Sequence, residues 1–204
     1  MSLHWYFSAF PAGTFAQVFG SSGSEAIAAF LELIEWEGKE GGGEFDVPTT
    51  QDLARRVLTE GLDYRGRSNQ VCKLLDQIVA SALSPEGAEA LGLEALSVGG
   101  CDGPDHVWAR FANKAKPSAP FKVLPWLERG RRWGTSAQCS DVWGAHLVLA
   151  PAEVALLAPE LKEVIALRIA DPTYVDDLEE FVLPQLAELE GRDIELVGHS
   201  VSFR

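Results

Sequence analysis

The two ends of the chain carry alternating apolar residues, and this pattern limits the fold more than any other feature of the sequence. Residues 2–10 are dense in aromatic side chains and are followed by Pro11 and Gly13. Residues 194–203 also alternate, after a turn at residues 191–193. Alternation with a period of two is typical of strands that bury one face. We therefore expect the first and last segments to pair in one sheet, with the termini close together.

Amphipathic helices are predicted between these strands. Ser24 is expected to cap a helix over about 25–37, where apolar residues recur at helical spacing. Thr49 and Asp52 have the spacing of a capping box for a second helix, which Gly61 ends. The Gly-rich stretch near 38–46, between the two helices, is expected to be a flexible loop or a disordered insertion.

The pattern of helices continues towards the C-terminus. Ser68 can cap a third helix with a wide apolar stripe, and the Ser84-Pro85 pair starts a short helix over 86–92. Residues 146–149 read as a strand that leads into a helix at Pro151. A further helix over 171–189 is expected to break near residue 183, because Pro184 lies within it.

These elements predict a single α+β domain over 1–204. Several helices pack on a small, mainly antiparallel sheet that includes the N- and C-terminal strands. The middle region 97–145 contains four of the six tryptophans. It is expected to be irregular, with a short helix near 105–113. Residues 194 and 196 are expected to face the helices, and Gly198 to mark a bulge or bend.

Composition limits the setting and the partners. The net charge of −13 argues against nucleic acid binding, whose affinity comes largely from neutralising phosphates. No apolar run approaches the ~20 residues of a membrane span, and the N-terminal residues do not resemble a signal peptide. Three cysteines without C-x-x-C spacing are typical of a reduced, cytoplasmic protein.

One segment runs against the acidic balance. Residues 105–133 contain seven basic and two acidic residues. Such a segment can form an anion or partner site, or it can pair with acidic groups of the same protein, which charge patterning favours. Arginine beside tryptophan can bind phosphate or stack on a ring. The candidate ligand-binding residues, for a pocket around 126–146, are Trp126, Arg131, Arg132, Trp133 and His146.

The string Gly198-His199-Ser200-Val201-Ser202 approaches the G-x-S-x-G turn that presents a nucleophilic serine. That turn needs a helix after the serine, and only four residues follow Ser200 in this sequence. On a strand, His199 points to the face opposite Ser200 and cannot act as its base. We therefore predict no catalytic residue.

A metal site is also weighed. Cys101, His106, Cys139 and His146 could together close a tetrahedral zinc site. Their intervals of four and six intervening residues do not match the usual short ligand spacings. We predict no metal and no cofactor, and whether the four side chains converge is left open.

Part of the chain resembles uncharacterised bacterial domains of the YfbM-like type (the DUF1877 group) and the related DUF7691 group. The resemblance rests on the stretch 54–78 with its Gly61-x-Asp63-Tyr64 link, on residues 146–149 leading into 152–154, and on the turn at 191–193 before a terminal strand. It covers about half of the chain. It implies a cytoplasmic α+β domain without assigned catalytic residues.

These observations favour a non-catalytic protein-interaction module. An acidic surface would bind a basic protein partner, in an immunity, antitoxin-like or regulatory role. The alternative is a small-molecule-binding protein or enzyme that uses the pocket around 126–146, so enzymatic activity stays open. A nucleic acid or membrane partner is not expected.

Overall fold

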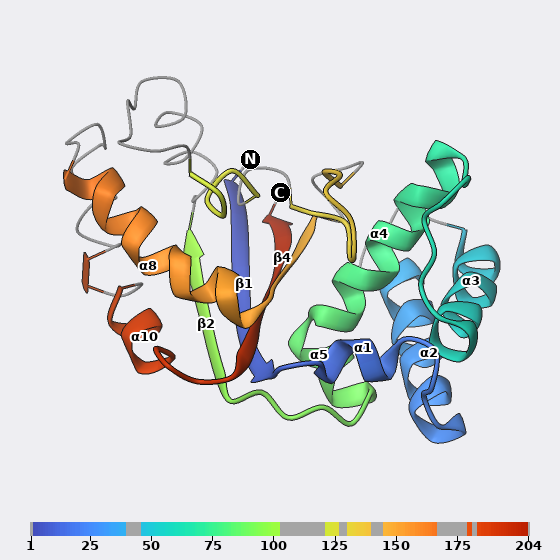
Figure 1. Cartoon of the computed structure of the whole chain (residues 1–204). Coiled ribbons are helices and arrows are strands. Elements are labelled where there is room, and N and C mark those ends of the chain that lie inside the picture. Colours follow the sequence, from blue (N-terminus) through green and yellow to red (C-terminus); the bar gives the residue numbers. More distant parts are fainter. Residues whose placement is uncertain are drawn as a thin grey trace.

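One four-stranded antiparallel sheet runs through the molecule (Figure 1). The structure is a computed structural model that describes residues 2–39, 46–102, 121–126, 130–139, 145–166, 179–180 and 183–203. The strands are β1 (Ser2–Pro11), β2 (Ser97–Asp102), β3 (His146–Leu149) and β4 (Ile194–Phe203), in the order β2-β1-β4-β3. The chain ends therefore form the central pair of strands, which confirms the prediction from their alternating sequences.

Helices cover both faces of this sheet. One face packs against α1 (Thr14–Val18), α2 (Ser24–Lys39), α3 (Val47–Glu60), α4 (Asn69–Leu83) and α5 (Pro85–Ala90), and the other against α8 (Pro151–Ala166) and α10 (Leu183–Glu188) (Figure 1). The predicted class, several helices on a small antiparallel sheet with both terminal strands, is confirmed. None of the described helices is both long and apolar enough to cross a bilayer.

Alternate residues of β4 contribute to two separate cores. Ile194 and Leu196 pack in the cluster that includes Leu157 and Leu161 of α8. Val197 packs in the cluster formed by α1 to α5. Because helices cover both faces, all residues of β4 from 194 to 199 are buried. The sequence predicted the face that carries Ile194 and Leu196, but the opposite face is a second core.

Two of the four predicted helix caps are confirmed. The cap predicted at Ser24 is wrong, because α2 already begins at Ser24 and the Gly23 carbonyl accepts the Ile27 amide, which makes Gly23 the residue that precedes the helix. The Ser68 hydroxyl accepts a hydrogen bond from the Val71 amide, and the Ser84 hydroxyl accepts one from Gly87, as N-caps do. The capping box predicted at Thr49 is wrong. The carboxylate of Asp46 accepts the Thr49 amide, so Asp46 is the N-cap and α3 begins at Val47, with Pro48 in the first turn where no amide is needed.

Other predicted breaks have mixed outcomes. α10 begins at Leu183 with Pro184 in its first turn, and most of the helix predicted before residue 183 lies outside the described residues. The bulge predicted at Gly198 is wrong, because the pairing register of β4 continues without a step through this residue. The sequence did not predict β2. The predicted helix near 105–113 and most of the Gly-rich loop lie outside the described residues.

A buried carboxylate joins the last strand to the first helix. Glu195 lies on the face of β4 that packs against α1 to α5 and is 6% exposed. Its carboxylate accepts hydrogen bonds from the amides of Gly13 (3.2 Å) and Phe15 (2.9 Å), at the start of α1. The N-cap residue Gly13 has no side chain to do this. Glu195 thus satisfies helix-terminal amides from a distance of 180 residues in the sequence.

Glu195→Gln should destabilise the protein by about 1–3 kcal/mol, because two charge-assisted hydrogen bonds are weakened in a buried site. The free energy of unfolding, measured by urea denaturation, tests this. The exposed Glu190→Gln substitution is the matched control and should change it by less than about 0.5 kcal/mol. Equal effects of the two substitutions would show that the Glu195 contacts do not anchor α1.

Candidate functional site

The five candidate ligand-binding residues lie close together at β3. Trp126 lies in the described stretch 121–126, and Arg131, Arg132 and Trp133 lie in the described stretch 130–139. The Arg131 amide donates to the His146 carbonyl (2.7 Å), and the Trp133 amide donates to Nε2 of His146 (3.3 Å). The Arg131 guanidinium stands 5.5 Å from the centre of the Trp126 ring. The structure thus places them as neighbours, and the roles of their side chains differ.

Arg131 connects three elements through its guanidinium. It binds the Glu153 carboxylate of α8 with two nitrogens, at 2.5 and 2.7 Å, and donates to the Val148 carbonyl of β3 at 2.6 Å. Hydrogen bonding from Arg131 holds the pKa of Glu153 below its usual value. The same carboxylate accepts the Ala150 amide at the start of α8. Arg131 is therefore engaged in a structural ion pair.

Arg132 compensates a buried charge. Its Nε lies 3.2 Å from both carboxylate oxygens of Asp76, which is fully buried on α4. The guanidinium carbon of Arg132 also lies 5.4 Å from the centre of the Tyr64 ring. The two arginines that the sequence singled out thus pair with acidic groups of the same protein, which is the outcome that charge patterning favoured.

Trp133 is partly buried and packs against the hydrophobic core beneath α1 to α5. Its ring meets Phe15 and Phe19 edge to face, with centroids 6.1 and 5.3 Å apart. Such geometry is typical of aromatic packing in protein interiors. Trp133 therefore fixes the segment 130–139 against α1 and the loop that follows it.

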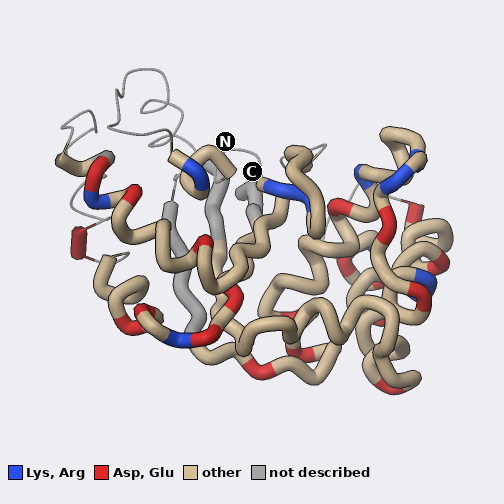
Figure 2. Tube along the Cα trace, viewed as in Figure 1, with Lys and Arg blue, Asp and Glu red and all other residues tan. Residues whose placement is uncertain are grey.

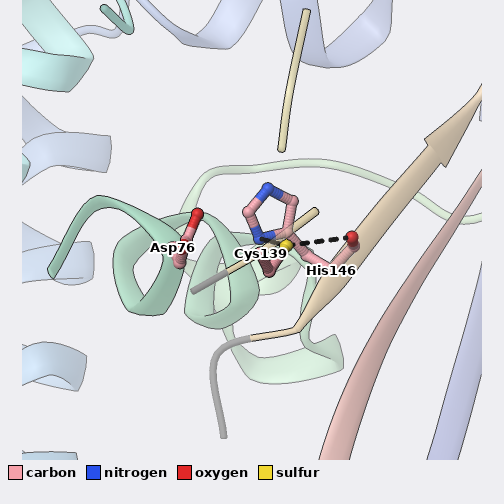
Figure 3. A group of neighbouring side chains, drawn as sticks. All are labelled: Asp76, Cys139 and His146. Atoms are coloured by element: carbon pink, nitrogen blue, oxygen red, sulfur yellow. Dashed lines mark hydrogen bonds between the residues drawn. The ribbon is translucent and has the colours of Figure 1, made fainter. Parts of the chain in front are cut away.

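His146 and Cys139 are both buried and contact each other (Figure 3). Sγ of Cys139 lies 3.6 Å from Nδ1 of His146 and 3.5 Å from its carbonyl oxygen. Because Nε2 accepts the Trp133 amide, we assign the ring proton to Nδ1, which faces the sulfur. The thiol then donates to the His146 carbonyl. Burial raises the pKa of the Cys139 thiol to about 12, so it is protonated at neutral pH and a poor nucleophile.

Gly130 allows this close approach to β3. Its φ is +72°, and a Cβ atom there would come within 2.5 Å of the His146 carbonyl oxygen. Any other residue would therefore collide with the strand and strain the backbone. The glycine places Arg131 and Arg132 where their acidic partners can reach them.

Asp76 completes a cluster of three buried groups. One carboxylate oxygen of Asp76, Sγ of Cys139 and one ring nitrogen of His146 lie within 4.8 Å of one another (Figure 3). They come from α4, from the segment 130–139 and from β3. The sequence analysis named Cys139 and His146 but missed Asp76. The available signal was an acidic residue on the apolar stripe of α4, four positions after Cys72.

The remaining candidates are placed as follows. His106 lies outside the described residues, and for Cys101 and Ser200 the structure describes the backbone alone, opposite Trp5 in both cases. His199 stacks on Tyr6 with ring centroids 5.6 Å apart. It also pairs with His146 in the register of β3 and β4, so both histidines lie on the face covered by α4.

Comparison with protein-family models, curated proteins and solved structures finds no match to the chain.

Arg132→Met should destabilise the protein by about 3–5 kcal/mol, because it leaves the Asp76 charge buried without its partner. Removing both charges in Arg132→Met/Asp76→Leu should restore part of this loss. The exposed Arg65, which pairs with Asp63, gives the control Arg65→Met with an effect below about 1 kcal/mol. Denaturant unfolding measures all three variants, and equal losses for Arg132 and Arg65 would contradict the buried-pair interpretation.

His199 should make the protein sensitive to acid. Burial lowers the pKa of His199 from 6.5 to about 4. Below pH 6.5 the unfolded chain therefore binds more protons than the folded chain. The contribution of His199 to stability is present above pH 6.5 and is lost as the pH falls through 4.

His199→Phe keeps a ring against Tyr6 and removes the titrating group. Between pH 7 and pH 4, the wild type should lose about 3 kcal/mol more stability than the variant. Urea denaturation across this pH range measures the difference. Parallel pH profiles for the two proteins would show that His199 is not held neutral by the fold.

Proposed function

We propose that this protein is a non-catalytic protein-interaction module that binds a basic protein through an acidic surface. The observation that supports this is a group of exposed carboxylates at one end of the sheet, which we name the acidic edge. Its residues are Glu86, Glu89, Glu94, Glu188, Glu190 and Asp193.

Two distant segments of the chain build the acidic edge. One is α5 with the loop after it, and the other is α10 with the turn before β4. Both lie against the end of β1, where the Leu96 amide donates to the Ala9 carbonyl (2.6 Å) and the Ala12 amide donates to the Asp193 carbonyl (3.2 Å). Figure 2 shows the acidic positions along the lower edge of the molecule, from the turn before β4 to α5.

Little positive charge offsets this surface. Arg192 is the one basic residue in the two segments 85–96 and 184–195. Arg131 and Arg132 belong to the basic stretch of the sequence, but both are engaged in ion pairs within the protein. Leu96 is 50% exposed at the same edge and adds an apolar contact among the carboxylates. A basic partner would gain both steering and specificity from this arrangement.

An immunity or antitoxin-like protein is the most concrete form of this role, and a regulatory protein is the other. We place it in the bacterial cytoplasm, where buried free cysteines such as Cys72 and Cys139 stay reduced. Kinship with the YfbM-like and DUF7691 domains is part of the same proposal.

The alternative, a ligand pocket around 126–146, has weaker support. Arg131 and Arg132 both bind carboxylates of the same chain. Trp133 packs edge to face on two phenylalanines, and His146 is fully buried. A ligand would have to displace these contacts before it could use the side chains.

Charge reversal tests the proposal. Glu89→Lys/Glu188→Lys/Glu190→Lys changes the acidic edge, and Glu32→Lys/Asp52→Lys/Glu60→Lys is a control of equal charge on exposed positions of α2 and α3. Affinity purification from the source cells, followed by reconstitution with the purified partner, should identify one basic protein. Its binding should weaken roughly tenfold or more with the edge variant and at high salt, and much less with the control.

Two results would contradict the acidic edge as the binding surface. One is a stoichiometric partner that binds the edge variant and the wild type equally well. The other is the absence of any stoichiometric partner. Growth arrest by the partner alone, relieved by co-expression of this protein, would distinguish an immunity or antitoxin-like role from a regulatory one.

A further inference from the structure

We propose that Asp76, Cys139 and His146 form a binding site for a thiophilic divalent cation, with zinc as the ion that fits best. The ligands would be a carboxylate oxygen, Sγ and Nδ1. The site is independent of the acidic edge and of the proposed partner.

The distance between the two soft ligands supports a shared ion. Zinc binds thiolate sulfur at about 2.3 Å and imidazole nitrogen at about 2.0–2.1 Å, so tetrahedral geometry places the two atoms about 3.6 Å apart. In the structure, Sγ of Cys139 and Nδ1 of His146 are separated by 3.6 Å. The Asp76 oxygen lies within 4.8 Å of Sγ of Cys139 and of one ring nitrogen of His146, so a small movement of this side chain would complete a three-ligand face.

Tyr64 supplies a second, independent observation. Its hydroxyl oxygen is buried and has no hydrogen-bond partner of good geometry in the described part of the chain. Burial raises the pKa of this hydroxyl, and the charges of Asp76 and Cys139 together with a hydrogen-bonding contact to Asp76 raise it further, so the hydroxyl lies beside Asp76. A buried polar group without a partner usually indicates a water or an ion that completes the network. A water molecule in the fourth position on zinc would give the Tyr64 hydroxyl this partner.

Arg132 would support the same site from outside. Its Nε binds both oxygens of Asp76 at 3.2 Å. A metal-bound carboxylate commonly keeps such a hydrogen bond, which orients it towards the ion. The charges of Asp76, the Cys139 thiolate, the zinc ion and Arg132 would then sum to one positive charge.

Proton balance follows from the ligand set. The Cys139 thiol proton leaves to solvent as the S–Zn bond forms, so one proton is released for each ion. The His146 proton moves from Nδ1 to Nε2, and the proton count of the ring is unchanged. Nε2–H can no longer accept from the Trp133 amide, which must turn away. Binding should therefore shift the amide resonance of Trp133.

Calorimetry on tag-free, reduced protein is the primary experiment, with zinc titrated in buffers of different ionisation enthalpy. We expect one site and release of about one proton near neutral pH. Cys139→Ser should weaken binding by at least about 100-fold, because it removes the soft ligand. Cobalt should give tetrahedral visible bands with a thiolate charge-transfer band, and Cys139→Ser should abolish the latter.

Cys72→Ala is the control for a second buried thiol, because Cys72 contacts Arg132 but is not one of the three ligands. It should bind zinc with unchanged stoichiometry. Absence of a saturable site on the wild-type protein would overturn the proposal, as would full binding by Cys139→Ser. Equal losses for Cys72→Ala and Cys139→Ser would overturn the ligand assignment. Zinc-edge X-ray absorption of the wild type, expected to show one sulfur among nitrogen and oxygen ligands, decides independently of any variant.

Discussion

Pairing of the two ends of the chain is the constraint on which the rest of the structure depends. β1 and β4 pair along ten positions, from Ser2 opposite Phe203 to Pro11 opposite Ile194. Each face of this central pair supports one helical layer, so neither core is complete until the last strand arrives. Contacts of such high sequence separation slow folding, because the loop between them must close first. The helices α2 to α4 make local contacts with one another and can form earlier.

A sheet that is covered on both faces must satisfy its polar groups internally. The face towards α1 to α5 carries Glu195, His146 and His199, and each is accommodated in a different way. Glu195 accepts hydrogen bonds from backbone amides, and His146 accepts one from the Trp133 amide. His199 stays neutral and stacks on the ring of Tyr6. Burying polar groups is costly unless they are paired or neutral, so these arrangements are conditions for the fold.

Local sequence signals predicted the elements whose cause is local. The terminal strands follow from their alternation, and Ser68 and Ser84 follow from capping chemistry. β2 was missed because its sequence, with two glycines, has little strand propensity, and its conformation comes from pairing with β1. The Asp46 cap was missed because a competing signal lay three residues later.

The site was predictable in the same uneven way. Charge patterning anticipated that the arginines would pair within the protein, whereas Trp133 was assigned to a ligand pocket and instead packs on Phe15 and Phe19. The partners could not be predicted, because Asp76 is separated from Arg132 by 56 residues and helical periodicity does not show which segment covers a helix face. The absence of a bulge at Gly198 is likewise a property of the neighbouring strands.

Arg131 also has a consequence for how copies of this protein meet one another. β3 is the last strand of the sheet on its side, and an uncovered outer strand offers carbonyls on which a strand from another molecule can build. The Arg131 amide donates a hydrogen bond to the His146 carbonyl, and the Arg131 guanidinium donates one to the Val148 carbonyl. The amide and the guanidinium of Arg131 thus satisfy two outward-facing carbonyls of the four-residue strand β3, which protects this edge of the sheet from aggregation.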